Sequence, residues 1–143
     1  MSVEIVEATE AADIDACFAV RHEVFIGEQK VTVEQDRDGR DGEAMHFLAR
    51  EDGRPVGAMR VRIVGDAGKL ERVCVLKERR GTGAGAAMTR AALAKLRSMP
   101  GIVRVILGAQ VPAIPFYERL GFTAHGEIYD DSGIAHRSMA LEL

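Results

Sequence analysis

A basic, glycine-rich stretch in the middle of the chain has the residue types of an anion site. The apolar run Leu70–Leu76 predicts a strand. It leads through Arg79 and Arg80 into glycines at positions 81, 83 and 85, where an amphipathic helix begins. Glycines allow several backbone N–H groups to converge on one point, and a helix N-terminus adds partial positive charge. The stretch therefore suits a pyrophosphate, which an arginine could also contact. A glycine-rich turn that only starts a helix is the alternative.

Two other phosphate-binding loops do not fit this stretch. The chain contains no G-x-x-x-x-G-K-[ST] pattern, which excludes a P-loop. Gly81-x-Gly83-x-x-Ala86 matches the loose dinucleotide fingerprint, but about 20 residues later the run Val103–Ile106 offers no acid for a ribose. The preceding strand also belongs to a predicted antiparallel meander, so a Rossmann domain is excluded.

The remaining pattern predicts a mixed sheet with helices. Period-two alternation between turn residues predicts strands, and helical spacing with end signals predicts helices. The expected strands are 3–7, 46–50, 56–64, 70–76, 102–107, 123–129 and 136–141. The expected helices are one capped by Thr9, one over 83–99 and a short one over 112–120, with a long loop over 27–43. Strands joined by short turns must be antiparallel, whereas helical connections allow parallel pairs.

Length and composition predict one domain over residues 1–143. A chain of this length can bury a core without a disulfide or metal, and 47% hydrophobic with 29% charged residues is an ordinary soluble mixture. The net charge of -3 gives no field that would attract nucleic acid or an acidic membrane. Cys17 and Cys74 lie in apolar runs and are expected to be buried thiols. Without a secretory leader or an apolar run of ~18 residues, a cytoplasmic protein is expected.

No metal site is expected either. His22-Glu23 begins like the zinc motif H-E-x-x-H, but Ile26 stands where the second histidine belongs. The acidic run that starts at Asp36 matches a calcium loop only in part, because Arg40 and Phe47 occupy ligand positions.

Two motifs in this chain resemble those of the GNAT superfamily of N-acetyltransferases. Arg80–Gly85 looks like its R-x-x-G-x-G/A pyrophosphate loop, and residues 109–122, AQVPAIPFYERLGF, resemble its second motif, A-x-x-F-Y-x-x-x-G-F. One helix and one strand separate the two motifs, as in the family, and the predicted order of elements matches over nearly the whole chain. Residues 21–25 with Glu28-Gln29, His46 and Ala109-Gln110 are similar to the ElaA-like branch.

The resemblance implies a fold and a co-substrate. The fold is α/β (α+β): a mixed, mostly antiparallel sheet of six to seven strands with a splayed central pair and about four helices. Acetyl-CoA is then the co-substrate, with no metal. The first splayed strand pairs with the pantetheine, and the glycine loop holds the pyrophosphate. The cofactor-binding residues implied are Val73, Cys74, Val75, Arg80, Gly81, Thr82, Gly83, Ala84, Gly85, Gln110 and Phe116.

The resemblance also implies direct transfer, in which an amine attacks the bound thioester. Tyr117 of the second motif would stand near the thioester sulfur and protonate the leaving thiolate, since a phenol with a pKa near ~10 holds its proton at pH 7. Packing against Phe122 is the alternative role for Tyr117. Cys74 on the cofactor strand would allow a covalent route, but its apolar neighbours favour a buried packing thiol.

An amine acceptor needs a base, which the sequence does not identify. For an amine with a lysine-like pKa of ~10.4, deprotonation at pH 7 costs roughly 4.6 kcal/mol. Glu71, His46 and Glu28 are the candidates. His136, in the last pair of strands, could touch the substrate or be an exposed strand histidine.

The function expected is acetyl transfer to a small-molecule, peptide or protein amine, with the acceptor itself left open. Arg60, Arg62 and Arg72 could form a patch for an acidic acceptor or a solvated sheet face with acidic partners. A hydrophilic loop over 27–43 that swings over the site would suit an enzyme. The alternative function is a non-catalytic acyl-CoA-binding or sensor module on the same fold, which the presence of Tyr117 disfavours. A homodimer is expected only because family members are often dimers.

Overall fold

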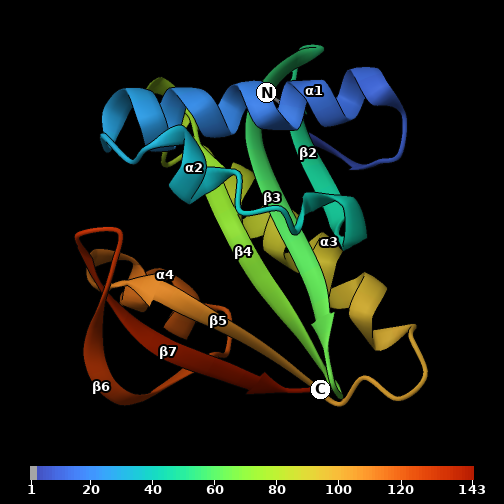
Figure 1. Ribbon diagram of the computed structural model, residues 1–143. Coiled ribbons are helices and arrows are strands. Elements are labelled where there is room, and N and C mark those ends of the chain that lie inside the picture. Colours follow the sequence, from blue (N-terminus) through green and yellow to red (C-terminus); the bar gives the residue numbers. More distant parts are fainter. Residues whose placement is uncertain (1–2) are drawn as a thin grey trace.

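The computed structural model describes residues 3–143, which form a seven-stranded mixed sheet with helices on both faces (Figure 1). The strands are β1 (Val3–Ala8), β2 (Met45–Glu51), β3 (Arg54–Val64), β4 (Ala67–Val75), β5 (Arg104–Gln110), β6 (Thr123–Asp131) and β7 (Ile134–Glu142). Their order is β1-β2-β3-β4-β5-β7-β6, and β4 and β5 are the one parallel pair among the described strands. The expected mixed, mostly antiparallel sheet is confirmed.

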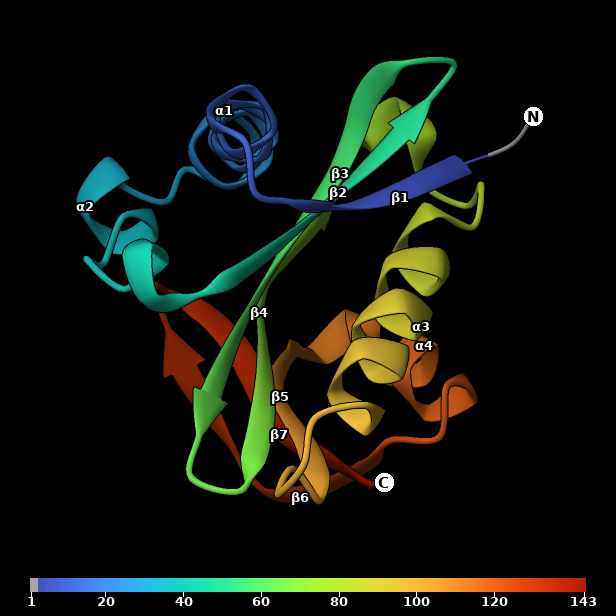
Figure 2. The same ribbon diagram turned by 90° about the vertical axis from the view of Figure 1, so that its right-hand side faces the viewer.

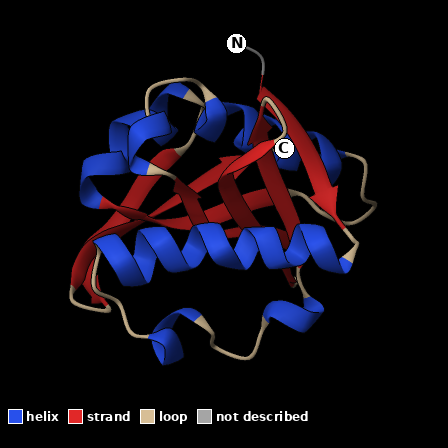
Figure 3. Ribbon diagram, turned by 90° about the horizontal axis from the view of Figure 1, so that it is seen from above, coloured by secondary structure: helices blue, strands red, loops and turns tan. Residues whose placement is uncertain are grey.

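Two layers of helices enclose the sheet. On one face lie α1 (Ala11–Arg21), the π-helix η1 (His22–Glu28) that continues it, and the short α2 (Val33–Asp36). On the other face lie α3 (Ala84–Arg97) and α4 (Ile114–Arg119), as Figure 2 shows. Seen from above in Figure 3, the strands lie between helices on both sides. Three 3-10 turns complete the described chain: η2 (Asp41–Glu43), η3 (Lys77–Arg79) and η4 (Val111–Ala113).

Two details near the N-terminus differ from the sequence prediction. The N-cap of α1 is Glu10 rather than Thr9, and its side chain makes no capping hydrogen bond. The segment predicted as a long loop contains η1, α2 and η2. A capping box starts α2, in which Thr32 accepts from the Gln35 backbone and the Gln35 side chain accepts from the Thr32 backbone. Local capping therefore orders a stretch whose charge pattern predicts only a loop.

Side chains of β3 alternate between two cores, one under each helical layer. Met59 and Val61 belong to the core beneath α3, where Met88 is fully buried. Ala58 belongs to the core beneath α1, together with Cys17. Both faces of the central strands are therefore covered, as the period-two geometry of a strand requires in a three-layer protein.

A bulge in β4 lies where this strand separates from β5. Arg72 has a left-handed backbone with φ 53°. The register between β3 and β4 shifts there, so that Arg72 and Val73 lie opposite Met59 alone. Such an extra residue bends a strand. β4 pairs with β5 only over Ala67–Leu70, and beyond this stretch the two strands diverge (Figure 1). This is the splayed central pair that the resemblance implies.

Gly68 of β4 packs beneath α3, at a place with room only for a glycine. A Cβ at this position would lie 2.5 Å from Leu96 Cδ1, and Leu96 is fully buried. Gly68→Ala should therefore lower the free energy of unfolding by about 1–3 kcal/mol, as overpacking a core does. Chemical denaturation measures this change. Gly42→Ala is the matched control because its added Cβ would meet nothing within 4 Å. Equal stabilities of the two variants would contradict this packing.

Candidate active site

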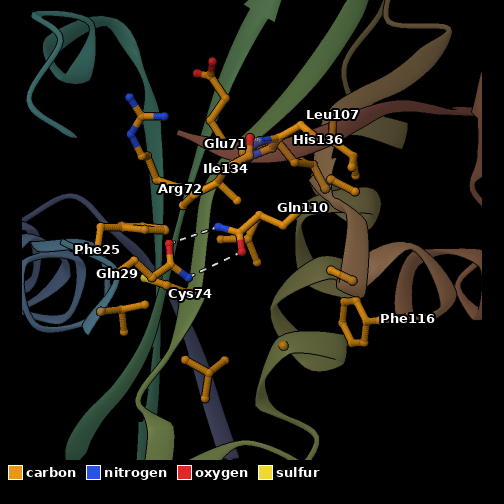
Figure 4. Close-up of a pocket in the computed structure, with 18 of the residues that line it drawn as sticks. Phe25, Gln29, Glu71, Arg72, Cys74, Leu107, Gln110, Phe116, Ile134 and His136 are labelled. Atoms are coloured by element: carbon orange, nitrogen blue, oxygen red, sulfur yellow. Dashed lines mark hydrogen bonds between the residues drawn. The ribbon is translucent and has the colours of Figure 1, made fainter. Parts of the chain in front are cut away.

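The divergence of β4 and β5 opens a cleft of about 650 Å³, a size suited to a small-molecule ligand. Its walls come from β4, the glycine loop, β5, α4, the region around η1, and the β6–β7 hairpin (Figure 4). Most of the predicted site residues meet here: Glu71, Val73, Cys74, Val75, Arg80, Gly81, Gly83, Ala84, Gly85, Gln110, Phe116 and Tyr117. Three predicted residues, His46, Glu28 and Thr82, lie outside this lining.

The glycine loop, residues 80–85, presents backbone N–H groups at one end of the cleft. Gly81 and Gly83 have φ angles of 80° and 94°, which residues with side chains rarely adopt. Gly83 is the N-cap of α3 and provides no side-chain acceptor for the first N–H groups of that helix. Thr82 turns away and donates its hydroxyl to the Arg79 carbonyl oxygen at 2.6 Å. The loop therefore combines backbone donors with the positive end of a helix dipole.

Glu28 holds Arg80 at the edge of this loop. The guanidinium nitrogens Nη1 and Nη2 of Arg80 donate to the two Glu28 carboxylate oxygens at 2.7 and 2.6 Å. Its Nε donates to the Val75 carbonyl oxygen at 3.0 Å. The hydrogen bond from Arg80 lowers the pKa of Glu28. Glu28 is therefore an anchor between η1 and the glycine loop and a poor proton acceptor.

A pair of glutamine amides spans the middle of the cleft. Gln110, the last residue of β5, donates its Nε2 to Gln29 Oε1 at 3.0 Å, and Gln29 Nε2 lies 3.4 Å from Gln110 Oε1. Figure 4 shows these two bonds crossing from one wall to the other. The sequence pointed to Gln29 only as part of the ElaA-like motif. Its pairing joins positions 81 residues apart and has no local sequence signal.

Tyr117 on α4 lies in an aromatic stack beside the cleft. Its ring centroid is 4.9 Å from that of Phe116 and 5.8 Å from that of Phe122, both at edge-on angles. The residue is 7% exposed and lines the cleft. Burial raises the pKa of Tyr117, so its hydroxyl stays protonated at neutral pH. The expected packing against Phe122 is therefore present, and the hydroxyl can still serve as a hydrogen-bond donor.

Two arginines hold the carboxylate of Glu71. Arg62 donates from Nε at 2.6 Å and from Nη2 at 3.1 Å, and Arg60 donates from Nε at 3.1 Å. Burial alone would raise the pKa of Glu71, but the hydrogen bond from Arg62 and the charges of both arginines outweigh it, so the pKa is lowered. Glu71 therefore lines the cleft as a carboxylate that is ionised at neutral pH, which makes it a weak base.

Arg60 lies at the centre of a buried ion network. It is 0% exposed and pairs with Asp38 at 2.8 Å and Asp41 at 3.1 Å. Arg21, 1% exposed, pairs with Asp41 at 2.6 Å. The network includes Arg21, Arg60, Arg62, Arg72, Asp36, Asp38, Asp41 and Glu71. The acidic partners expected for Arg60 are therefore present, but the prediction of a solvated face or an open basic patch is wrong for it, because residues 36–41 cover this side of β3.

The same network ties down the segment that sequence analysis described as a swinging loop. Arg72 donates to the carbonyl oxygen of Gln35 at 3.0 Å and to that of Asp36 at 3.3 Å. Asp36 in turn accepts from Arg21 at 3.2 Å and is 3% exposed. Residues 35–41 are therefore anchored to the bulge of β4 and to α1.

His46 lies apart from the cleft. It is 3% exposed, donates from Nε2 to the Asp41 carbonyl oxygen at 2.9 Å, and packs edge-on against Phe18. Among the side-chain nitrogen and oxygen atoms of residues 3–143, its Nδ1 is the one that is buried without a hydrogen-bond partner. This placement gives no support to His46 as the base.

Cys74 lines the cleft without being a suitable nucleophile. The residue is 5% exposed, and burial raises the pKa of its thiol to about 12. Because the thiolate is the reactive form, a covalent intermediate on Cys74 is disfavoured. Cys17 is likewise buried, and burial raises its pKa to about 11.

The β6–β7 hairpin forms another wall of the cleft, so His136 lies where it could touch a substrate, whereas the sequence did not predict the place of Tyr129. Tyr129 stacks on His136 with ring centroids 5.8 Å apart and an angle of 24°, and both line the cleft. The Tyr129 hydroxyl lies so close to Gly108 of β5 that an added Cβ there would collide with it. A register shift between His125 and Tyr129 turns the strand at this point. Gly126 was the only sequence signal for it.

Two further observations concern the described part of the chain. Residues 3–143 contain no group of three or more His, Cys, Asp or Glu side chains placed to hold a metal ion. None of the helices in this range is long and apolar enough to cross a membrane.

The carboxylates that pair with arginines should make stability depend on pH in the acid range. The hydrogen bond from Arg60 lowers the pKa of Asp38. A carboxylate whose pKa is lower in the folded than in the unfolded state stabilises the fold above the unfolded pKa, and this contribution is lost as the pH falls. We expect the free energy of unfolding to decrease below about pH 4, the usual aspartate range. Urea titrations across this range measure the slope, and Asp38→Asn should flatten it. An unchanged slope would contradict this role of Asp38.

Comparisons with known proteins agree with this geometry. The sequence model of the "Acetyltransferase (GNAT) domain" family matches residues 8–143. The "Uncharacterized N-acetyltransferase YjcF" of Bacillus subtilis is 41% identical over 123 residues, covering 85% of this chain and 87% of the relative. The crystal structure of Escherichia coli ElaA has a TM-score of 0.86 and 27% identity, covering 99% of this chain and 100% of that chain. An acyl-CoA N-acyltransferase from Pseudomonas aeruginosa has a TM-score of 0.84 and 27% identity, covering 98% and 99%. The chain therefore belongs to the GNAT acetyltransferase family.

Proposed function

We propose that this protein is an N-acetyltransferase that moves the acetyl group of acetyl-CoA to a primary amine by direct attack. One observation carries the proposal. The pairing of β4 with β5 ends at Leu70, and Val73–Val75 then line the cleft between the glycine loop and Tyr117. The names of two similar proteins, an N-acetyltransferase and an acyl-CoA N-acyltransferase, support the same class of reaction.

The residues of the cleft fit the chemical parts of acetyl-CoA. A strand edge without a neighbour can pair with the amides of an extended arm such as pantetheine. The N–H groups of residues 81–85 and the N-terminus of α3 would hold the pyrophosphate. Arg80 would contact a phosphate oxygen through a charge-assisted hydrogen bond, in exchange for part of its pairing with Glu28.

In the reaction, the neutral amine nitrogen attacks the thioester carbonyl carbon. The new C–N bond forms, the C–S bond breaks, and the thiolate of CoA leaves. The Tyr117 hydroxyl would donate a hydrogen bond to the departing sulfur. Because burial raises the pKa of Tyr117, this hydroxyl stabilises the thiolate chiefly as a donor, and water can complete its protonation. The raised pKa of Cys74 supports direct attack rather than an acyl-cysteine intermediate.

Tyr117→Phe separates catalysis from binding. The variant keeps the aromatic packing and loses only the hydroxyl, so turnover should fall by about 10²-fold, the lower range for loss of a general acid. Its affinity for CoA should stay unchanged. Thiol release from acetyl-CoA in the presence of an amine panel measures turnover, and calorimetry measures CoA binding.

The same experiment discriminates against the alternative function. A non-catalytic acyl-CoA-binding module would bind CoA and release no thiol with any amine, in the wild type and in Tyr117→Phe alike. If the turnover of Tyr117→Phe equals that of the wild type, the protein is still an enzyme, but Tyr117 has no part in its mechanism.

A further inference from the structure

The proposed reaction leaves one proton without an acceptor. An alkylamine arrives as an ammonium ion, and its nitrogen attacks only after losing a proton. The carboxylates considered from the sequence are engaged: arginines hold Glu71 and Glu28, and both have lowered pKa values. We propose, on the basis of the proposed function, that His136 of β7 accepts this proton.

His136 lies on the acceptor side of the cleft. It is paired in register with Gln110, the last residue of β5, and it is half-buried in the lining. Figure 4 shows His136 on the same side of the Gln29–Gln110 pair as Glu71, with Phe116 on the other side. An amine that enters beside the hairpin would therefore meet His136 before it reaches the bridging amides.

The hydrogen bond of its ring fixes which nitrogen is free. Nδ1 of His136 lies 2.7 Å from the carbonyl oxygen of Ile134. A carbonyl oxygen can only accept, so Nδ1 carries the hydrogen and Nε2 of the neutral ring has an open lone pair. Nε2 has no hydrogen-bond partner among residues 3–143. It is not one of the buried polar atoms, so it is accessible. It is therefore open to the cleft and able to accept a proton.

The hairpin also fixes the orientation of the ring. Tyr129 of β6 stacks on His136, and its own hydroxyl end sits over Gly108 of β5. The imidazole thus has a hydrogen bond at one edge and an aromatic ring against one face. This is the arrangement of an oriented base rather than of a mobile surface histidine.

Charged and polar groups from β4 and from the β6–β7 hairpin line the same part of the cleft. β4 contributes the ionised Glu71, with Lys69 and Arg72, and the hairpin contributes Tyr129 and Asp131. Arginines hold the Glu71 carboxylate, so the carboxylate of Asp131 is the one that can attract an ammonium ion here.

The protons balance in this scheme. His136 Nε2 takes one proton from the ammonium, and the free amine attacks the thioester carbonyl. The departing thiolate takes up one proton from water through the hydrogen bond of Tyr117, and the amide nitrogen loses its second proton to solvent. His136 then returns its proton to solvent, so that one proton is released for each amide and free thiol formed.

Two small amines of similar shape test this assignment. At pH 7 ethylamine is an ammonium ion, whereas 2,2,2-trifluoroethylamine is largely neutral because fluorine withdraws electrons. His136→Gln should lower kcat/KM about 10²-fold for ethylamine, the scale of lost base catalysis, and leave the value for trifluoroethylamine nearly unchanged. His125→Gln, an exposed histidine of the same hairpin, is the matched control and should affect neither amine. Equal losses for both amines, or no loss, would overturn the assignment.

A second measurement does not depend on turnover. Nitrogen NMR of the imidazole rings, assigned by the disappearance of signals in His136→Gln, should show a protonated Nδ1 and an unprotonated Nε2 in the neutral ring. The opposite tautomer would overturn the assignment of His136. If the wild type acetylates neither these amines nor any member of the amine panel although it binds acetyl-CoA, the proposed acetyl transfer fails, and the tautomer still decides whether His136 is an oriented base.

Discussion

Arg72 has a left-handed backbone in the middle of β4, and the cleft depends on how this strained position is held. A left-handed conformation is unfavourable for a residue with a side chain, so it persists only where the surroundings stabilise it. The guanidinium of Arg72 provides that support through the carbonyl oxygens of Gln35 and Asp36. The bulge bends β4 away from β5. The edge of β4 on which the arm of an acyl-CoA can lie is therefore exposed because Arg72 ties the bulge to α2.

The buried ions around Arg60 extend this support into the site. Four arginines and four carboxylates share contacts between α1, residues 36–41, β3 and β4. Breaking one such pair would leave an uncompensated charge, so the network acts as a unit. It has a chemical consequence as well, because it keeps Glu71 ionised beside the cleft. The ionised state of Glu71 and the anchoring of residues 35–41 therefore have a single origin.

Residue spacing and local patterns were sufficient to predict the order of the strands and helices, the glycine loop and the second motif. Each depends on neighbours in sequence: Gly83 begins a helix, and Tyr117 lies on a short amphipathic turn. The remaining features arise from contacts across the chain. Arg60 alternates with apolar residues as an exposed side chain would, and only residues 36–41 folding over β3 bury it. The orientation of His136 follows from a bulge in β6, which the alternating pattern does not show.

Titration calorimetry with acetyl-CoA tests the central claim most directly, namely that the gap between β4 and β5 is an acyl-CoA site. NAD is the control, because it carries a pyrophosphate but no pantetheine. The account predicts saturable binding of acetyl-CoA at one site per chain and no binding of NAD. Absence of binding at millimolar acetyl-CoA would contradict the account, because the glycine loop would then only start a helix. Equal binding of both compounds would also contradict it, because the edge of β4 would then not bind the pantetheine arm.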